Sequence, residues 1–174
     1  MNTRLSFARD ARVLALGTIL LSTSTSALVA APRSAAPATG ATVEADLKAF
    51  KVSGTKLVSA TSANPGEIIE YQARYTNTGS APALRFAPQL PVPDALVFVS
   101  GSALPDAVLA STDGKNFAPA PLVRLVKGAD GKTRSVAVPL REYRVLRWQL
   151  GTLAPGQSVT VKARARVKSF GDGR

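Results

Sequence analysis

The stretch "SVTVKARARVK" (residues 158–168) decides the fold class of this 174-residue chain. Small or β-branched apolar residues alternate with cationic or hydroxyl-bearing residues, which is the period of a β-strand and not of a helix. We therefore expect one face of this strand to pack into a core and the other to meet water. The expected inward residues are Val159, Val161, Ala163, Ala165 and Val167, and the expected outward residues are Thr160, Lys162, Arg164, Arg166 and Lys168.

Three other runs show a strand-like organisation. In "EIIEYQARYT" (67–76), Ile69 and two tyrosines fall on one face, and in "REYRVLRWQL" (141–150), Trp148 shares a face with two leucines. The short apolar run "LVFVS" (96–100) fits a buried strand. Turn residues separate these runs at Pro65-Gly66, Asn77 to Gly79, Ser100-Gly101, Asp113-Gly114, Asp130-Gly131 and Pro155-Gly156.

These runs and turns predict an all-β fold. No window of about 12 or more residues after the predicted signal peptide carries an apolar helical stripe, and many short strands with frequent turns are typical of an antiparallel β-sandwich. The stretch "VRLVKGADGKTRSVAV" (123–138) predicts a hairpin around Asp130-Gly131. We expect the folded domain to span residues 43–170.

The N-terminal residues are organised like a targeting signal. Three Arg in the first twelve residues precede the short apolar run "VLALGTILL" (13–21), and small residues follow it. Such a run is too short to span a bilayer, which takes about 20 residues. We expect residues 1–30 to be a cleaved signal peptide, with cleavage after Ala27 or Ala30. Residues 31–42, rich in Pro, Ala and Gly, are expected to form a flexible leader.

The amino-acid composition excludes several kinds of functional site. There is no Cys and no His, which excludes disulfides, thiol nucleophiles, Cys/His zinc sites and the imidazole of a Ser-His-Asp triad. An exported domain without disulfides must be stabilised by apolar burial, for which this length is sufficient. The predicted signal contains three of the 22 Lys and Arg and one of the 11 Asp and Glu, so the mature chain is basic, with a net charge near +9.

From residue 65 to residue 168 the chain resembles the bacterial conserved-repeat domain known as domain of unknown function number eleven. The order and spacing of three pieces carry this resemblance. The pieces are "PGEIIEYQARYTNTGSAPA" (65–83), "LPVPDALVFVSGS" (90–102) and "WQLGTLAPGQSVTVKARARV" (148–167).

The resemblance implies an immunoglobulin-like antiparallel β-sandwich found in exported and surface proteins of bacteria. Family members often hold this domain in tandem arrays, whereas this chain holds one copy. The family pattern carries no enzymatic activity, so it implies no catalytic residue.

Polar residues near the turns and strand starts are expected to be structural. In "TNTGS" (76–80), Asn77 and Gly79 lie where a strand must reverse, and an Asn side chain can hydrogen-bond nearby backbone. Glu67 and Glu70 are the one close carboxylate pair in the strand region. We expect them to point to opposite faces, with Glu70 solvated.

Two further features are also expected to be structural. Asp113 and Asn116 lie in "STDGKNF" (111–117), which lacks the further oxygen ligands and terminal Glu of a calcium loop, so a hairpin turn is expected. Phe117 is expected to return to the core after this turn. Trp148, the only Trp, is expected to be a central packing residue and not a ligand platform.

Lys162, Arg164, Arg166 and Lys168 are the candidate site. Alternate strand residues lie about 6.5 to 7 Å apart, so the four cations form a row about 20 Å long. One interpretation is a solvated face whose charge also discourages edge-to-edge aggregation. The alternative is a polyanion site for lipopolysaccharide, wall polymer or nucleic acid, although the intervening residues are Val and Ala and not the exposed aromatics of nucleic-acid readers.

Together these features predict a non-enzymatic, exported structural or protein-interaction module of the bacterial cell envelope, in the periplasm or at the cell surface. The expected partner is another envelope or surface protein, and a polyanion is the alternative. We expect no catalytic residue, metal, cofactor or small-molecule substrate, and no transmembrane span after signal cleavage. An enzyme is the least favoured class because His and Cys are absent.

Overall fold

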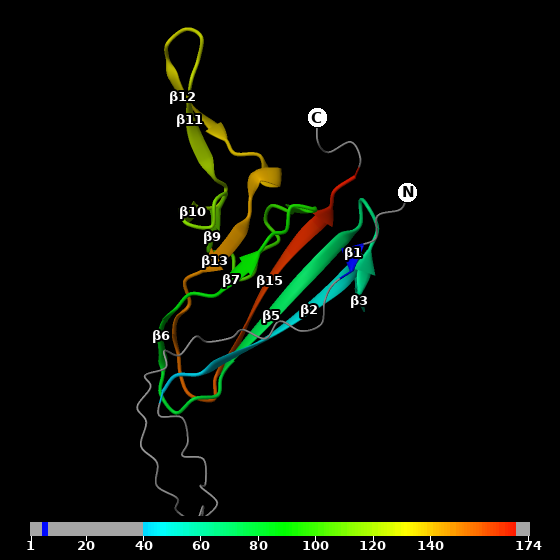
Figure 1. The fold of residues 1–174 in the computed structure, drawn as a ribbon, viewed down its shortest axis with the longest axis vertical. Coiled ribbons are helices and arrows are strands. Elements are labelled where there is room, and N and C mark those ends of the chain that lie inside the picture. Colours follow the sequence, from blue (N-terminus) through cyan, green and yellow to red (C-terminus); the bar gives the residue numbers. More distant parts are fainter. Residues whose placement is uncertain (1–4, 7–39, 170–174) are drawn as a thin grey trace, which may run out of the picture.

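The chain folds into antiparallel β-sheets (Figure 1). A computed structural model describes residues 5–6 and 40–169. Within these ranges the one helical element is the short 3-10 turn η1 (Leu140–Glu142), and no helix has the length and apolar character needed to cross a bilayer. Most of the predicted signal peptide (1–30) and leader (31–42) lies outside the described residues.

One layer of the molecule is a five-stranded sheet in the order β3-β2-β5-β15-β8. β15 pairs with β5 along its length, with Ile69 opposite Ala165 and Ala73 opposite Val161. This register places the predicted inward residues of both strands on the same face. The strands are β2 (Val43–Ser53), β3 (Lys56–Ser59), β5 (Ile68–Asn77), β8 (Leu96–Phe98) and β15 (Ser158–Val167).

The second layer is a four-stranded sheet in the order β10-β9-β13-β7. β13 pairs antiparallel with both β7 and β9. Three strand pairs lie outside the two layers: β6 with β14, β11 with β12, and β1 with β4. The bounds are β1 (Leu5–Ser6), β4 (Ser62–Ala63), β6 (Ala83–Phe86), β7 (Gln89–Pro91), β9 (Val108–Ser111), β10 (Ala118–Pro119), β11 (Val123–Lys127), β12 (Thr133–Ala137), β13 (Val145–Trp148) and β14 (Gly151–Leu153).

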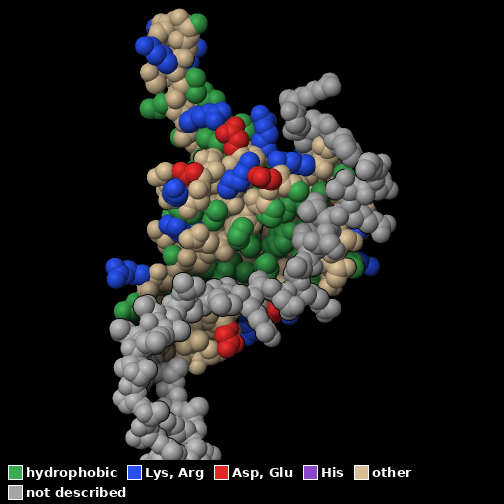
Figure 2. All heavy atoms as spheres, in the orientation of Figure 1, with side chains coloured by type: hydrophobic (Ala, Val, Ile, Leu, Met, Phe, Trp, Pro, Cys, Tyr) green, Lys and Arg blue, Asp and Glu red, His purple; other side chains and the backbone are tan. Residues whose placement is uncertain are grey.

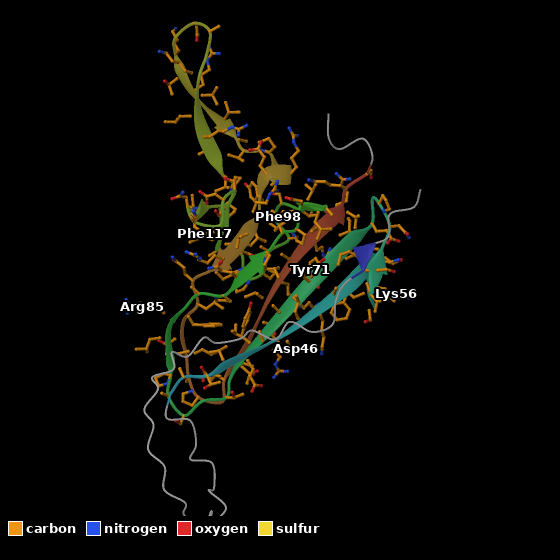
Figure 3. The ribbon with its side chains drawn as sticks, in the orientation of Figure 1. Asp46, Lys56, Tyr71, Arg85, Phe98 and Phe117 are labelled. Atoms are coloured by element: carbon orange, nitrogen blue, oxygen red, sulfur yellow. The ribbon has the colours of Figure 1, made fainter. Side chains whose placement is uncertain are left out.

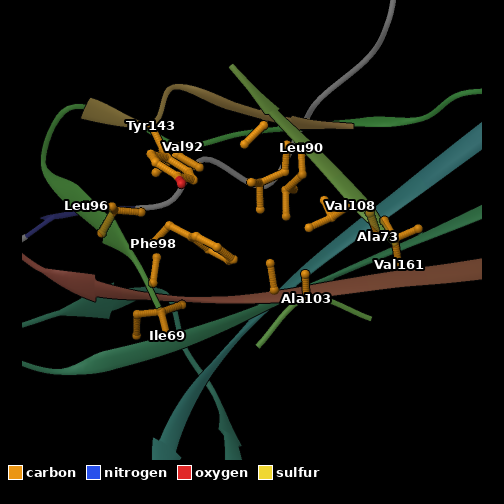
Figure 4. Packing of buried hydrophobic residues seen from close by; sticks show 14 of the residues in the cluster. Ile69, Ala73, Leu90, Val92, Leu96, Phe98, Ala103, Val108, Tyr143 and Val161 are labelled. Carbon is orange, nitrogen blue, oxygen red and sulfur yellow. The ribbon is translucent and has the colours of Figure 1, made fainter. Parts of the chain in front are cut away.

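The core lies between the two layers (Figure 4). Leu146 and Trp148 from β13 and Val161 from β15 are fully buried, as their alternation predicted. The indole Nε1 of Trp148 donates to the carbonyl oxygen of Pro105 at 2.8 Å, so the polar atom of this side chain has a partner inside the core. The all-β fold is confirmed: antiparallel sheets pack face to face, as in an immunoglobulin-like sandwich.

The turn after β5 is held by Asn77, whose predicted structural role is confirmed. Its buried Nδ2 donates to the carbonyl oxygens of Ala81 at 2.8 Å and Leu153 at 2.9 Å, and its Oδ1 accepts the N–H of Gly79 at 3.1 Å. Gly79 is needed because a Cβ there would collide with the backbone of residues 40–42. Asn77 and Gly79 therefore bring together the turn at residues 77–81, Leu153 and residues 40–42.

The predicted hairpin turn after β9 is confirmed, but the predicted position of Phe117 is wrong. Asp113 Oδ1 accepts the backbone N–H groups of Asn116 and Lys115, each at 2.8 Å, and these hydrogen bonds lower the pKa of Asp113. Phe117 is half-buried and does not belong to the buried core (Figure 3). The guanidinium of Arg147 lies 3.5 Å from the centre of its ring, which makes a cation–π contact instead.

Candidate functional site

The predicted basic row lies on β15, which is an internal strand of the five-stranded sheet. β5 pairs with it on one side and β8 on the other. The prediction that this charge protects a sheet edge is therefore wrong. The four side chains also differ in exposure: Arg164 is exposed, whereas Lys162, Arg166 and Lys168 are half-buried.

Arg164 is held by a carboxylate on the neighbouring strand. Its Nε donates to Oε2 of Glu70 at 2.8 Å, and Nε2 of Gln72 donates to the other oxygen of the same carboxylate at 2.7 Å. The Glu70 side chain is only 8% exposed, so the expectation of a solvated Glu70 is wrong. The cross-strand register, which places Glu70 opposite Arg164, is the reason.

Two opposing effects act on the pKa of Glu70. Burial raises it, because the charged form loses solvation. The hydrogen bonds from Arg164 and Gln72, together with the positive charges of Arg164 and Lys162, lower it and prevail, so the pKa lies below its usual value. The centre of the basic row is therefore an ion-paired network, which reduces the positive charge available to a polyanion.

A second surface projects from the body of the molecule. β11 and β12 form a hairpin that extends beyond both layers (Figure 1), and every residue of the two strands is exposed. We call residues 123–137 the hairpin arm. Figure 2 shows apolar side chains along this arm together with Lys and Arg. Its large exposed apolar residues are Val123 (64%), Leu125 (75%), Val126 (42%) and Val136 (43%).

Apolar side chains lie on both faces of the hairpin arm. Residues directly opposite each other in a hairpin share a face, so Val123 and Leu125 lie on one face and Val126 and Val136 on the other. An isolated two-stranded hairpin is marginally stable in water. Because none of these four side chains is buried within the described fold, they are available for contact with another molecule.

The hairpin arm is fixed to the core at its base. The N–H of the buried Leu122 donates to the hydroxyl of Tyr143 at 2.7 Å, and the carbonyl oxygen of Leu122 accepts the N–H of Val138 at 2.9 Å. Tyr143 is fully buried, and its ring stacks on Phe98 with the ring centres 5.9 Å apart. The sandwich therefore holds the base of the arm in a defined position.

A cleft of about 270 Å³ lies where the arm leaves the sandwich. Phe117, Leu122 and Val138 contribute apolar lining, and Arg124 and Glu142 also line it. The last two form an ion pair, with 2.9 Å between Arg124 Nη1 and Glu142 Oε2. The cleft extends the apolar surface of the hairpin arm toward the core.

The close carboxylate pair, Glu67 and Glu70, has separate partners. Glu67 accepts the backbone N–H of Asn64 at 2.7 Å and a hydrogen bond from Lys51 Nζ at 2.9 Å, and these contacts lower its pKa. Glu70 is bound by Arg164. Within residues 5–6 and 40–169, no three His, Cys, Asp or Glu side chains lie close enough together to hold a metal ion.

Comparisons of the chain with protein-family models, with curated proteins and with solved structures give no match. The resemblance of residues 65–168 to the conserved-repeat domain therefore stays a prediction. The functional conclusion rests on the surfaces themselves, and the hairpin arm carries four of the nine large apolar side chains that are exposed in the described part of the chain.

Proposed function

We propose that the protein is a non-enzymatic, exported interaction module of the bacterial cell envelope or surface, and that the hairpin arm binds its protein partner. One observation carries this proposal: the arm presents four large apolar side chains to solvent on two faces. Gathered apolar exposure of this kind is typical of interaction sites. Export rests on the signal peptide predicted at residues 1–30.

The sandwich serves as a rigid holder for the arm. Because Tyr143 and Leu122 tie the base of the arm to the core, the base is already positioned when a partner binds, which lowers the entropy cost of binding. The outer edges of β11 and β12 pair with no described strand. The arm can therefore bind through its apolar side chains and by adding a strand to a partner's sheet.

Two matched leucine substitutions test this function. Leu125→Ser changes the hairpin arm, and Leu84→Ser changes a leucine of similar exposure on β6, 69% against 75%. Neither change should alter stability by more than about 0.5 kcal/mol, because both side chains are exposed. We expect the wild type and Leu84→Ser to capture the same proteins from an envelope extract at high salt, and Leu125→Ser to lose them. Capture that is unchanged in Leu125→Ser, or absent in the wild type, contradicts the proposal.

Polyanion binding by Lys162, Arg164, Arg166 and Lys168 is the second candidate function. The side chain of Arg164 is 44% exposed although it pairs with Glu70, which supports this candidate. It predicts affinity for lipopolysaccharide that falls steeply with salt and weakens in a Lys162→Gln/Lys168→Gln variant. Binding that is independent of salt and of these lysines contradicts it.

A further inference from the structure

We propose that the partner of the hairpin arm is a second copy of this chain, and that β11 of one copy adds as a strand to an open edge of β2 in the next. This inference rests on the proposed function, because it uses the same hairpin arm. We call residues 43–48 of β2, on the side away from β5, the open edge.

The open edge is an unpaired part of an otherwise paired strand. β3 covers residues 50–53 of β2, and the carbonyl oxygen of Ala49 accepts the N–H of Ala60 at 3.0 Å. Beyond this point no described strand pairs with residues 43–48 on the outer side, although β5 pairs with all of them on the inner side. Unpaired strand edges are templates for pairing with another chain.

The sheet face beside the open edge is apolar and partly uncovered. Leu47 shares a face with the buried Ala73 and Val161, yet it is 48% exposed. Ala45, two residues earlier on the same face, is also exposed. The second layer therefore does not cover this end of β2, and an added strand with apolar residues on that face would shield Leu47 and Ala45 from water.

The backbone groups of β11 and β2 match for antiparallel pairing. Alternate residues of an antiparallel strand direct their N–H and C=O groups to opposite sides. The bond between Ala49 and Ala60 shows that the odd-numbered residues of β2 face the open edge. Leu122 and Gly128 bond toward the β12 side of the hairpin, so the odd-numbered residues of β11 face outward. Odd-numbered residues of β11 can therefore form hydrogen-bonded pairs with odd-numbered residues of β2.

Pairing odd-numbered residues of β11 with odd-numbered residues of β2 allows a register in which apolar side chains lie opposite one another. With Leu125 opposite Ala45, Val123 lies opposite Leu47, and all four side chains lie on the core-facing side of the extended sheet. Leu125 and Val123 are the two most exposed large apolar residues of the arm. One contact would thus cover the uncovered end of β2 and one face of the arm.

Charge favours the same register. It places Arg124 opposite Asp46 on the outer face (Asp46 is labelled in Figure 3). There each side chain would exchange its partner within the chain, Glu142 for Arg124 and Lys48 for Asp46, for a cross-strand pair of opposite charge, which stabilises a sheet. Sliding β11 by two residues, so that Leu125 lies opposite Leu47, would place Arg124 opposite Lys48, a pair of like charges. The arm as a whole carries four Lys or Arg and one Asp, so it is attracted to the acidic start of β2.

The positions of the two surfaces call for a head-to-tail contact. The hairpin arm projects at one end of the molecule, and the start of β2 lies toward the other end (Figure 1). Contacts between two different surfaces of identical chains form rings or open-ended chains rather than closed dimers. A single short strand buries less than the roughly 1,200 to 2,000 Å² of a stable interface. We therefore expect weak association that increases with protein concentration.

Analytical ultracentrifugation of the purified protein tests the two surfaces separately. Leu125→Lys changes the arm, Leu47→Lys changes the open edge, and Leu84→Lys is the matched control at an exposed leucine outside both. We expect the mass-average of the wild type and Leu84→Lys to rise with concentration. Each of the other variants should self-associate about tenfold or more weakly, as expected when a central contact residue is lost.

Mixing the two deficient variants gives the decisive measurement. Leu125→Lys keeps an intact open edge and Leu47→Lys keeps an intact arm, so their mixture should form a 1:1 complex at concentrations at which each variant alone is monomeric. A monomeric wild type, self-association of Leu125→Lys that is as strong as that of the wild type, or a mixture that stays monomeric at those concentrations would overturn the inference. If the protein is monomeric but still captures other proteins through Leu125, the proposed function stands and only the identity of the partner is wrong.

Discussion

Replacing Tyr143 with Phe tests whether one hydroxyl fixes the base of the hairpin arm. The Tyr143 hydroxyl accepts the N–H of Leu122 at 2.7 Å in a buried position. Phe fills nearly the same volume, so Tyr143→Phe opens no cavity and keeps the stack on Phe98. The variant removes one hydrogen bond and leaves one buried donor without a partner.

The expected loss in the free energy of unfolding follows from that unpaired N–H donor. Leaving a buried N–H unsatisfied costs about 1 to 3 kcal/mol, so we expect Tyr143→Phe to lower the free energy of unfolding by about 2 kcal/mol. Tyr75→Phe is the matched control. The hydroxyl of Tyr75 donates to the carbonyl oxygen of Gln89 at 3.2 Å in an exposed position, where water can replace it, so we expect a change within about 0.5 kcal/mol.

Urea unfolding followed by the fluorescence of Trp148, the only Trp and fully buried, measures both changes. Amide hydrogen exchange locates the effect: in Tyr143→Phe, protection should fall most at Leu122 and along β11 and β12, because local opening there no longer breaks the anchoring bond. Equal stabilities of Tyr143→Phe and Tyr75→Phe, or unchanged exchange in the hairpin arm, would refute the idea that this hydroxyl anchors the arm.

Four further substitutions probe the turn held by Asn77 and the ion pair between Glu70 and Arg164. Asn77→Ala removes three hydrogen bonds at a buried site. It should lower the free energy of unfolding, measured by urea titration, by about 2 to 4 kcal/mol. A loss under about 1 kcal/mol would mean that water replaces the amide. Gly79→Ala forces a Cβ against backbone and should cost about 1 to 3 kcal/mol, whereas Gly40→Ala, which meets no atom nearby, should be nearly neutral. Because the pKa of Glu70 is lowered in the folded state, its stabilising contribution is present at neutral pH and is lost as the pH falls through that lowered pKa. Glu70→Gln should therefore lose less stability than the wild type between pH 7 and pH 3, and parallel losses would count against the ion pair.

The fold was predictable because the alternation of apolar and polar residues in its main strands indicates which side chains are buried. In β15, Val161 and Ala163 alternate with Lys162 and Arg164, and in β13, Leu146 and Trp148 alternate with polar or partly exposed neighbours. Period-two patterns of this kind are local properties of the chain, so no knowledge of the partner strands is needed. The same local information identified the turns around the hairpin at residues 123–138.

The charged surface was less predictable because pairing between distant strands decides it. Glu70 and Arg164 are 94 residues apart, and only the register of β5 against β15 makes them neighbours. Alternation correctly places both side chains on the outer face, but it does not show that one neutralises the other. Phe117 is a similar case, because its contact with Arg147 depends on how the β9–β10 turn folds over β13.

In the hairpin arm, the alternation of apolar residues predicts a buried face, but that face is exposed to solvent. Leu125 and Val123 occupy alternate positions, which in β15 marks a core-facing side, yet in the arm the same pattern faces solvent. Leu47 on β2 shows the same disagreement at the other end of the sandwich. An apolar strand face that the chain's described fold leaves uncovered is stable in water only at a cost, and contact with another molecule removes that cost. The two uncovered faces are therefore the places where binding should be sought, ahead of the basic row on β15, where Arg164 already has a partner within the chain.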